Sequence, residues 1–287
     1  MMHSIRERLA QDVAAIRQAL DLQQDEARSE VQALLQAVLV VNRAYLLAHP
    51  ERVLTEQELS RYQISLQRRL QGEPLAYILG EREFFGLTFK VTPATLIPRA
   101  DTELLVELAL ARIPPQGPCR VLDLGTGSGA IALSIAHARA DLDVTAVDAS
   151  EEALAVAQEN ARRLVVDNVR LLRSDWYEAL ADQRYHLIVS NPPYIPAGDG
   201  HLAQGDLRFE PLCALAAGTD GLDDIRRIVD GAGVHLMAGG WLLLEHGYDQ
   251  AAAVRGLLSQ AGLEKVCSDK DLAGIERVSS GCRSAEL

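Results

Sequence analysis

The stretch VLDLGTGSG at residues 121–129 decides the fold that we expect for most of this chain. Its apolar start predicts a short buried strand, and its glycines lead into a helix over 130–138. Because further apolar runs alternate with helical periodicity, we expect an α/β fold with a doubly wound, mostly parallel sheet. The remaining strands are predicted at 143–147, 169–173, 186–189 and 241–245, with a closing antiparallel hairpin around 272–274.

The glycine loop differs from the fingerprint that binds dinucleotide phosphates. Its third glycine comes one residue early, and Asp123 stands just before the loop, where a carboxylate repels phosphate but can hold an amino-bearing ligand. Asp148, at the tip of the second strand, is placed to accept hydrogen bonds from ribose hydroxyls. The alternative for Asp148 is a helix cap, a role that Ser150 serves equally well. The pattern therefore predicts a nucleoside ligand without phosphates.

Asp175 and Trp176 follow the third strand. The carboxylate is placed to receive an adenine amino group, and the indole offers a face on which a ring can stack. The alternative for Trp176 is an aromatic side chain that completes the core.

The sequence SNPPY at residues 190–194 ends the fourth strand, because neither proline can donate a ladder hydrogen bond. Asn191 precedes a proline and is held extended at the carboxyl end of a strand, where open α/β sheets bind ligands. Its side-chain oxygen and the Pro192 carbonyl provide two acceptors, and Tyr194 offers an aromatic wall. These groups suit a planar NH2 group; the alternative is that the motif is only a turn. The long polar loop over 195–207 is expected to shape the substrate pocket.

The composition argues against several classes of protein. The 287-residue chain has a net charge of −12, so stable nucleic acid binding is not expected, although a local basic patch stays open. Its four cysteines form no CxxC pair, and His235 and His246 lack partners at metal spacing, so no metal site is predicted. No early run reads as a signal peptide or a membrane span, and we expect a cytoplasmic protein without membrane contact.

Residues 5–72 show helical periodicity with almost no strand signal. Thr55 and Glu58 form a capping box for one of these helices. This part carries no clustered ligands, and we interpret it as an interaction domain. The expected domains are a helical bundle over 1–75, a linker with a β-hairpin over 76–100 and a catalytic domain over 101–287.

The glycine loop, Asp148, Asp175 and the NPPY motif together resemble class I S-adenosylmethionine-dependent methyltransferases. The NPPY motif narrows the resemblance to enzymes that methylate planar amide or exocyclic amino nitrogens. Within that group the chain is similar to the HemK/PrmC family of protein-(glutamine-N5) methyltransferases, which modify peptide chain release factors. One departure is Ala100, where the family often has a second proline. The shared motifs span essentially the whole chain: GEPLAYILG at 72–80, EFFG at 83–86, LIPR at 96–99, DTE at 101–103, RFEP at 208–211, LEHG at 244–247 and KDLAG at 270–274.

This resemblance implies a Rossmann-like, seven-stranded sheet, with S-adenosylmethionine as the cofactor and S-adenosylhomocysteine as its product. The catalytic groups would be Asn191 and Pro192, which orient the substrate amide. The helical bundle would dock the release factor, whose Gly-Gly-Gln motif would supply the glutamine. Cofactor contacts are implied for Gly125, Thr126, Gly127, Ser128, Gly129, Asp148, Trp176 and Asn191, and substrate contacts for Asn191, Pro192, Pro193 and Tyr194.

Two other functions stay open on the sequence alone. An N6-adenine methyltransferase of nucleic acids shares the glycine loop and the NPPY motif, but it needs a basic face and a pocket for a flipped base. The acidic charge and the helical N-terminal part count against it. A nonenzymatic adaptor that merely retains the fold is disfavoured by the intact Asn191 and glycines.

Overall fold

The computed structural model describes residues 4–115 and 117–285. The chain divides into two compact units. The helical unit consists of the residues up to Gly80 together with Ala203–Phe209, and the sheet unit consists of Glu81–Leu202 and the residues from Glu210 onwards.

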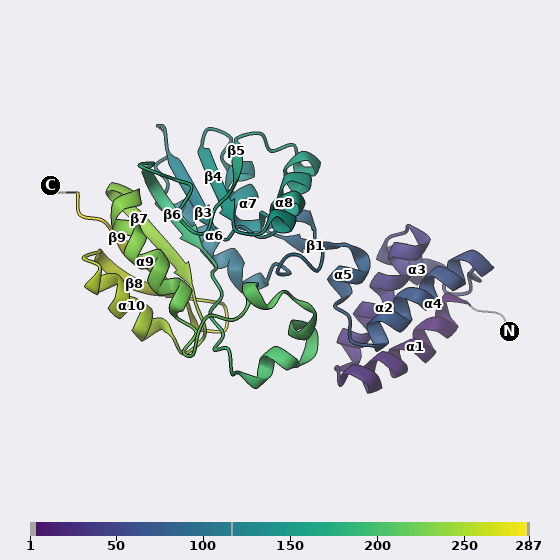
Figure 1. Cartoon of the computed structure of the whole chain (residues 1–287). Helices are drawn as coiled ribbons and strands as arrows, with labels where there is room; N and C mark the ends of the chain where they lie inside the picture. Colours follow the sequence, from purple (N-terminus) through teal and green to yellow (C-terminus); the bar gives the residue numbers. More distant parts are fainter. Residues whose placement is uncertain (1–3, 116, 286–287) are drawn as a thin grey trace. The chain divides into compact units, whose positions relative to one another are not determined.

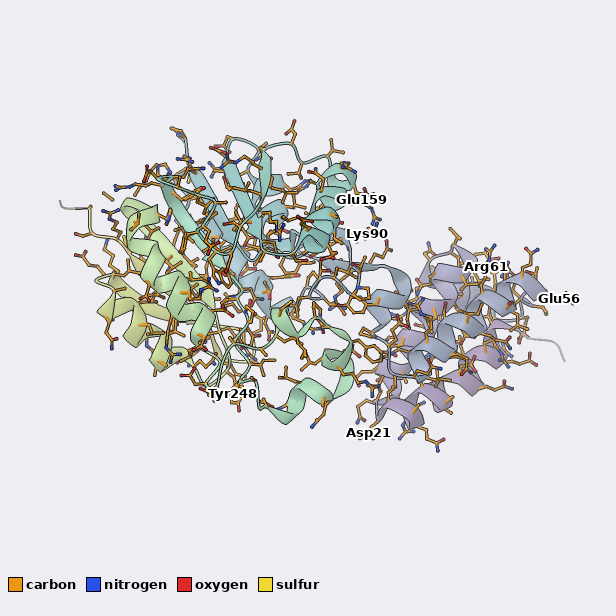
Figure 2. All side chains as sticks on the ribbon, in the orientation of Figure 1. Asp21, Glu56, Arg61, Lys90, Glu159 and Tyr248 are labelled. Carbon is orange, nitrogen blue, oxygen red and sulfur yellow. The ribbon has the colours of Figure 1, made fainter. Side chains whose placement is uncertain are left out.

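The helical unit follows the periodicity of its sequence. Thr55 and Glu58 form the expected capping box at the start of α4, because each side chain accepts a hydrogen bond from the other's backbone N–H. The apolar faces pack around a core that includes the fully buried Tyr62, while the outer face of α4 carries charged side chains such as Glu56 and Arg61 (Figure 2). The helices are α1 (Ile5–Leu20), α2 (Gln24–Leu39), α3 (Arg43–Ala48), α4 (Glu56–Leu70) and α5 (Leu75–Leu79).

A segment remote in sequence completes the helical unit and contains the 3-10 helix η3 (Gly205–Phe209). Asp206 Oδ1 lies 3.3 Å from Arg69 Nη1, and the Arg208 guanidinium donates a hydrogen bond to the Gln71 carbonyl at 3.0 Å. These contacts explain why the end of the long polar loop belongs to the helices and not to the sheet.

The sheet unit contains the expected hairpin, formed by β1 (Glu81–Phe84) and β2 (Leu87–Lys90), and a seven-stranded sheet in the order β5-β4-β3-β6-β7-β9-β8. Strands β3 to β7 are parallel, and β9 runs antiparallel to both of its neighbours. The prediction of a mostly parallel, Rossmann-like sheet is confirmed. The strands of this sheet are β3 (Arg120–Leu124), β4 (Asp143–Asp148), β5 (Val169–Arg173), β6 (Tyr185–Ser190), β7 (Leu236–Glu245), β8 (Glu264–Lys270) and β9 (Glu276–Cys282).

Helices cover both faces of this sheet (Figure 1). Alternate side chains of the strands enter two separate cores, one shared with the first three helices of the unit and the other with the last two. The helices are α6 (Glu103–Arg112), α7 (Ala130–Ala138) and α8 (Glu151–Leu164) on one face, and α9 (Asp223–His235) and α10 (Ala251–Gln260) on the other. The 3-10 segments of this unit include η1 (Ala100–Thr102), η2 (Gly200–Ala203) and η4 (Leu212–Ala214).

Two polar side chains fasten the hairpin to the sheet unit. Glu103 accepts a hydrogen bond from the Phe85 N–H at the hairpin turn, at 2.9 Å. Asn160, fully buried in α8, bonds to both backbone groups of Lys90, at 2.7 and 2.9 Å, and to the Ser128 carbonyl at 2.9 Å. Asn160 therefore joins the hairpin to the glycine loop.

No helix among the described residues is both long and apolar enough to cross a membrane.

Candidate active site

Four parallel strands end at one level at the carboxyl edge of the sheet. Leu124 of β3 pairs with Val147 of β4 and with Ser190 of β6, and Ser190 pairs with Leu244 of β7. The Ser190 hydroxyl also donates to the Leu124 carbonyl at 2.7 Å, which fixes β6 against β3 at this point. The residues that follow this row come from motifs far apart in sequence: Gly125, Asp148, Asn191 and Glu245.

The glycine loop turns tightly at the end of β3. Gly125 and Gly127 have φ angles of 72° and 56°, a left-handed conformation that glycine adopts without a steric penalty. A Cβ atom at Gly125 would lie 3.4 Å from the Trp176 ring, whereas one at Gly127 would meet nothing within 4 Å. The loop therefore presents bare backbone to open space beside the indole, as a flat ligand requires.

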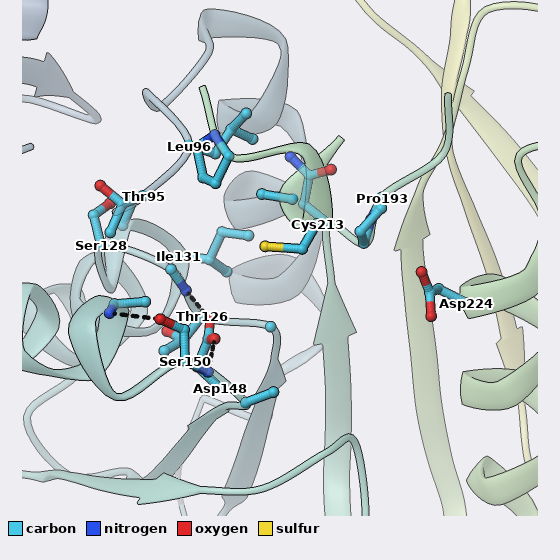
Figure 3. Close-up of a pocket in the computed structure, with 18 of the residues that line it drawn as sticks. Thr95, Leu96, Thr126, Ser128, Ile131, Asp148, Ser150, Pro193, Cys213 and Asp224 are labelled. Carbon is cyan, nitrogen blue, oxygen red and sulfur yellow. Dashed lines mark hydrogen bonds between the residues drawn. The ribbon is translucent and has the colours of Figure 1, made fainter. Parts of the chain in front are cut away.

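Asp148 ends β4 beside this loop (Figure 3). Its two oxygens accept hydrogen bonds from the Gly127 N–H at 2.8 Å and the Ser150 N–H at 2.9 Å. Burial raises the pKa of Asp148, and these backbone bonds counteract the rise. A carboxylate has about four acceptor positions, so both oxygens keep capacity for the hydroxyls of a ribose. Ser150 takes the capping role that the sequence allowed it, because its hydroxyl accepts from the Ala153 N–H at 3.1 Å at the start of α8.

Asp123 is completely buried and holds the glycine loop against α7, instead of facing the ligand as expected. Its Oδ2 accepts hydrogen bonds from the Thr126 hydroxyl at 2.7 Å and the Ala132 N–H at 3.2 Å. Burial raises its pKa to about 7. The reason for the difference is the direction of its side chain, because Asp123 lies inside β3 and points into the layer between sheet and helices.

Asp175 and Trp176 border the same pocket as the glycine loop. The Asp175 carboxylate pairs with Arg227 of α9 at 2.8 Å, and the Trp176 indole donates a hydrogen bond to Asp224. The indole lies across from Gly125 and also packs against the core that the sheet shares with α9.

Asn191 lies where the NPPY motif leaves the sheet. Its side-chain amide donates a hydrogen bond from Nδ2 to Thr102 Oγ1 at 3.1 Å. Within the NPPY motif, Asn191 and Pro193 line the pocket. Pro192 is buried, and Tyr194 packs into the core while its carbonyl accepts from Gln250 at 2.9 Å. Neither Pro192 nor Tyr194 is among the described residues that line this pocket.

One pocket collects the residues predicted from the glycine loop, β4, β5 and β6 (Figure 3). It has a volume of about 270 Å³. Of the residues expected to contact the cofactor, Gly129 does not line it: a Cβ there would lie 2.9 Å from Leu133, so this glycine serves close packing of α7. Those that line it are Gly125, Thr126, Gly127, Ser128, Asp148, Trp176 and Asn191.

The pocket also has walls that sequence reasoning missed. None of its lining residues comes from the 195–207 loop in the described part of the chain; the nearby wall is formed instead by Pro211, Cys213 and Ala214. The RFEP motif at 208–211 could have indicated Pro211 as part of this wall. Glu210 of that motif fixes the segment in place, because it accepts the Ile97 N–H at 3.0 Å and pairs with Arg99. Helix α9 adds polar groups that no motif marked. Lining residues not anticipated as contacts include Thr95, Leu96, Thr102, Ile131, Asp224 and Arg227.

Histidines and cysteines make no metal centre among the described residues, where no group of three or more His, Cys, Asp or Glu side chains is placed to hold an ion. His246 is buried with Nδ1 next to the Gly247 carbonyl at 2.9 Å and Nε2 next to the Ser279 hydroxyl at 2.8 Å. His235 lies 2.9 Å from the Gln183 carbonyl and stacks on Tyr177. Both histidines therefore serve packing.

Known proteins are similar to this chain in both fold and sequence. Residues 100–204 match the model of the methyltransferase small domain, and residues 13–80 match that of the PrmC N-terminal domain. A methyltransferase from Pyrococcus furiosus aligns with a TM-score of 0.54 at 21% identity, covering 76% of this chain and 97% of that one, and so shows the same fold.

Two curated relatives are much more similar in sequence. The release factor glutamine methyltransferase of Bordetella pertussis is 54% identical, over 88% of this chain and 94% of that protein. The protein of the same name from Escherichia coli K12 is 48% identical, over 93% of this chain and 96% of that protein.

The fold, the glycine loop and the NPPY motif define a class I methyltransferase that uses S-adenosylmethionine as its cofactor. The residues present fit this nucleoside, because they combine an open glycine backbone, an indole and a ribose acceptor without a phosphate site. At this level of identity and coverage, the chain belongs to the release factor glutamine methyltransferase family.

Proposed function

We propose that this chain methylates the side-chain amide nitrogen of the glutamine in the Gly-Gly-Gln motif of peptide chain release factors. The observation that carries the proposal is the position of Asn191. Its Nδ2 is held by Thr102, so its Oδ1 is the group left to meet a substrate NH2 in the pocket. The reaction takes place in the cytoplasm, where release factors work.

The cofactor is bound by the glycine loop and its neighbours. Gly125, Thr126, Gly127 and Ser128 provide close backbone approach, Asp148 accepts from the ribose and the Trp176 face stacks on the adenine. Gly129 contributes by packing α7 against the loop. S-adenosylmethionine supplies a methyl group that the positive sulfur has already activated.

Asn191 and Pro192 act by positioning the substrate. An amide nitrogen is a poor nucleophile, because its lone pair is delocalised into the carbonyl. The Asn191 side-chain oxygen and the Pro192 carbonyl accept hydrogen bonds from the substrate NH2 and hold the nitrogen in line for attack. The same two acceptors stabilise the positive charge that develops on nitrogen. Pro193 borders the substrate, and Tyr194 supports the motif from the core.

We assign release-factor docking to the helical unit. It contributes none of the residues that line the pocket in the described part of the chain. It does expose large apolar side chains, which a protein partner can cover: Val40, Leu47, Val53 and Ile64.

The activity is tested by incubating the purified protein with radiolabelled S-adenosylmethionine and three acceptors: a bacterial release factor, the same factor with its Gly-Gly-Gln glutamine changed to alanine, and duplex DNA. We expect label only on the unchanged factor. Label on the DNA instead would establish the N6-adenine alternative, and label on none of them would refute the proposed substrate.

The docking role has a matched pair of test positions. Val40 directly follows α2 and Val165 directly follows α8, both with a φ of 55° and with 89% and 88% of the residue exposed. Asn tolerates this backbone conformation, so each Val→Asn change removes apolar surface without adding strain. We expect Val40→Asn to raise the KM for the release factor several-fold and Val165→Asn to leave it unchanged. Equal KM values for both variants would contradict docking at this surface.

A further inference from the structure

We propose that Thr102 and Glu245 are positioning residues for this reaction, which hold the Asn191 amide with its oxygen toward the substrate. The inference rests on the proposed role of Asn191. It assigns a task to the DTE motif at 101–103 and the LEHG motif at 244–247, for which the proposed function gives no role.

The three residues come from three elements that converge at one edge. Ser190 of β6 pairs with Leu244 of β7, so Asn191 and Glu245 follow at the same level of adjacent parallel strands. Side chains alternate along strands, so both point to the face that α6 covers. Thr102 immediately precedes α6 on that face and lines the pocket.

The direction of the hydrogen bonds follows from the donors and acceptors available. Asn191 Nδ2 donates to Thr102 Oγ1 at 3.1 Å. Thr102 and Asn191 both reach the Glu245 carboxyl by hydrogen bonding. An amide nitrogen can only donate, so Thr102 Oγ1 accepts from Asn191, and the single proton of the hydroxyl is left for the Glu245 carboxyl. This chain of bonds leaves the Asn191 oxygen facing away, and no described residue donates to it.

Thr102 does not perform the usual task of its position. A threonine before a helix normally caps it by accepting a backbone N–H of the first turn. The Thr102 side chain makes no such bond to α6. Its buried hydroxyl is therefore committed to Asn191 and Glu245.

Glu245 is costly for the fold, which indicates a role beyond folding. It is 2% exposed, and one carboxyl oxygen, Oε2, has no hydrogen-bond partner among the described residues. Burial raises the pKa of Glu245 to about 7; the charge of Asp101 adds to the rise and that of Arg277 opposes it. A buried polar atom without a partner is unfavourable, and such groups concentrate at functional sites.

Without this chain of bonds, the Asn191 side-chain amide can rotate so that its oxygen and its NH2 group exchange places. Its NH2 group would then face the NH2 group of the substrate, and the acceptor would be lost. Because the fault is in alignment, the rate of transfer should fall while the affinity for the release factor stays close to that of the wild type.

The test compares Thr102→Val with Thr102→Ser, and with Thr145→Val as a control at an equally buried threonine of β4 outside the site. At saturating cofactor and release factor, we expect Thr102→Val to lower kcat at least about tenfold and to change KM less than about threefold. Thr102→Ser should restore kcat to within about threefold of the wild type, since it keeps the hydroxyl. Thr145→Val should behave as the wild type.

A double mutant separates positioning from general support of the fold. If Thr102 acts through Asn191, then Thr102→Val has no further effect on kcat in an Asn191→Ala background. Two losses that multiply would overturn the inference, as would a folded Thr102→Val variant with wild-type kcat. If Thr102→Val melts far below the wild type, the test uses Glu245→Gln and Glu245→Leu instead. Only the Gln variant keeps an acceptor for the Thr102 hydroxyl, so its kcat should be the higher of the two. Equal kcat values in the two variants would refute the inference.

The wild type distinguishes this inference from the function on which it rests. A wild type that leaves the release factor unmethylated overturns both. A wild type that methylates the glutamine, together with an active Thr102→Val variant, overturns the positioning role alone.

Discussion

Buried carboxyl groups occur in both units of the chain, but their surroundings differ. In the helical unit, Asp12 accepts a hydrogen bond from the Tyr62 hydroxyl at 2.8 Å and lies 3.8 Å from Arg8. In the sheet unit, Asp123 and Glu245 form no ion pair with the described residues, and each keeps one oxygen without a hydrogen-bond partner. Burial raises the pKa of all three groups.

The difference separates two uses of the same side-chain chemistry. Asp12 joins α1 to α4 and is compensated by a hydroxyl and a guanidinium, so its removal should affect stability. Asp123 and Glu245 lie at the edge that carries the pocket, where they hold the glycine loop and the Asn191 amide. Natural proteins accept such unfavourable burial at functional sites. Four predictions test this contrast.

The largest effect is expected for Asn191, which belongs to the pocket edge. Asn191→Ala removes the acceptor that orients the substrate, and misalignment should cost on the order of a hundredfold in the rate of methyl transfer. Asn191→Asp should also lose rate, because it cannot donate to Thr102 and places a second carboxylate beside Glu245. The measurement is single-turnover transfer to the release factor at saturating cofactor, alongside thermal melting.

Near-normal rates in both Asn191 variants would contradict the catalytic role. A loss of rate that accompanies a comparable loss of folding would instead support the role of a turn residue.

The second prediction concerns Asp148, the ribose acceptor. Asp148→Ala should weaken cofactor binding by about 1.5–3 kcal/mol, the contribution of a charged hydrogen bond. Asp143→Ala, at the exposed start of the same strand, is the matched control and should bind the cofactor normally. Isothermal calorimetry with S-adenosylmethionine measures both, and unchanged affinity in Asp148→Ala would disprove the assignment.

The third prediction moves to the helical unit. Tyr62→Phe leaves the buried Asp12 carboxyl without its hydroxyl partner, which should lower the free energy of unfolding by about 1–2 kcal/mol. The kcat for the release factor should remain that of the wild type, because this carboxyl serves packing. Urea unfolding and steady-state kinetics check the two parts; a fall in kcat would break the contrast between the units.

The fourth prediction is a pH dependence of stability that comes from Asp123. Its pKa is about 7 in the folded chain against a usual value of 3.8, so between these values the folded state binds more protons than the unfolded state. The free energy of unfolding must then fall as pH rises from about 4 to about 7. Asp123→Asn cannot titrate and keeps an oxygen for Thr126 and Ala132.

Melting temperatures of the wild type and Asp123→Asn across this range test the linkage. The melting temperature of the variant should rise relative to that of the wild type as pH rises, by roughly 2–4 °C for each kcal/mol of linkage in a domain of this size. A difference between the two proteins that stays constant with pH would show that Asp123 does not titrate in this window.

Much of the fold is encoded locally and could be predicted. The apolar runs at β3, β4, β5 and β6 and the helical periodicity between them depend on neighbours along the chain, and each element formed where its pattern indicated. The capping box at Thr55 is equally local. The glycine loop and the NPPY motif share this property, because glycine permits a left-handed backbone and proline fixes φ wherever they stand.

The sequence by itself thus determined the class of fold, the carboxyl ends of the strands and the motif residues that line the pocket. Only the tertiary structure decided that Asp123 faces inward, that Arg69 and Gln71 bind the end of the 195–207 loop, and that Thr102 joins Asn191 to Glu245. The contacts of Arg69, Gln71 and Thr102 each join a residue to a neighbour far away in the sequence. No periodicity along the chain encodes that neighbour, because it is set by how whole elements pack against one another.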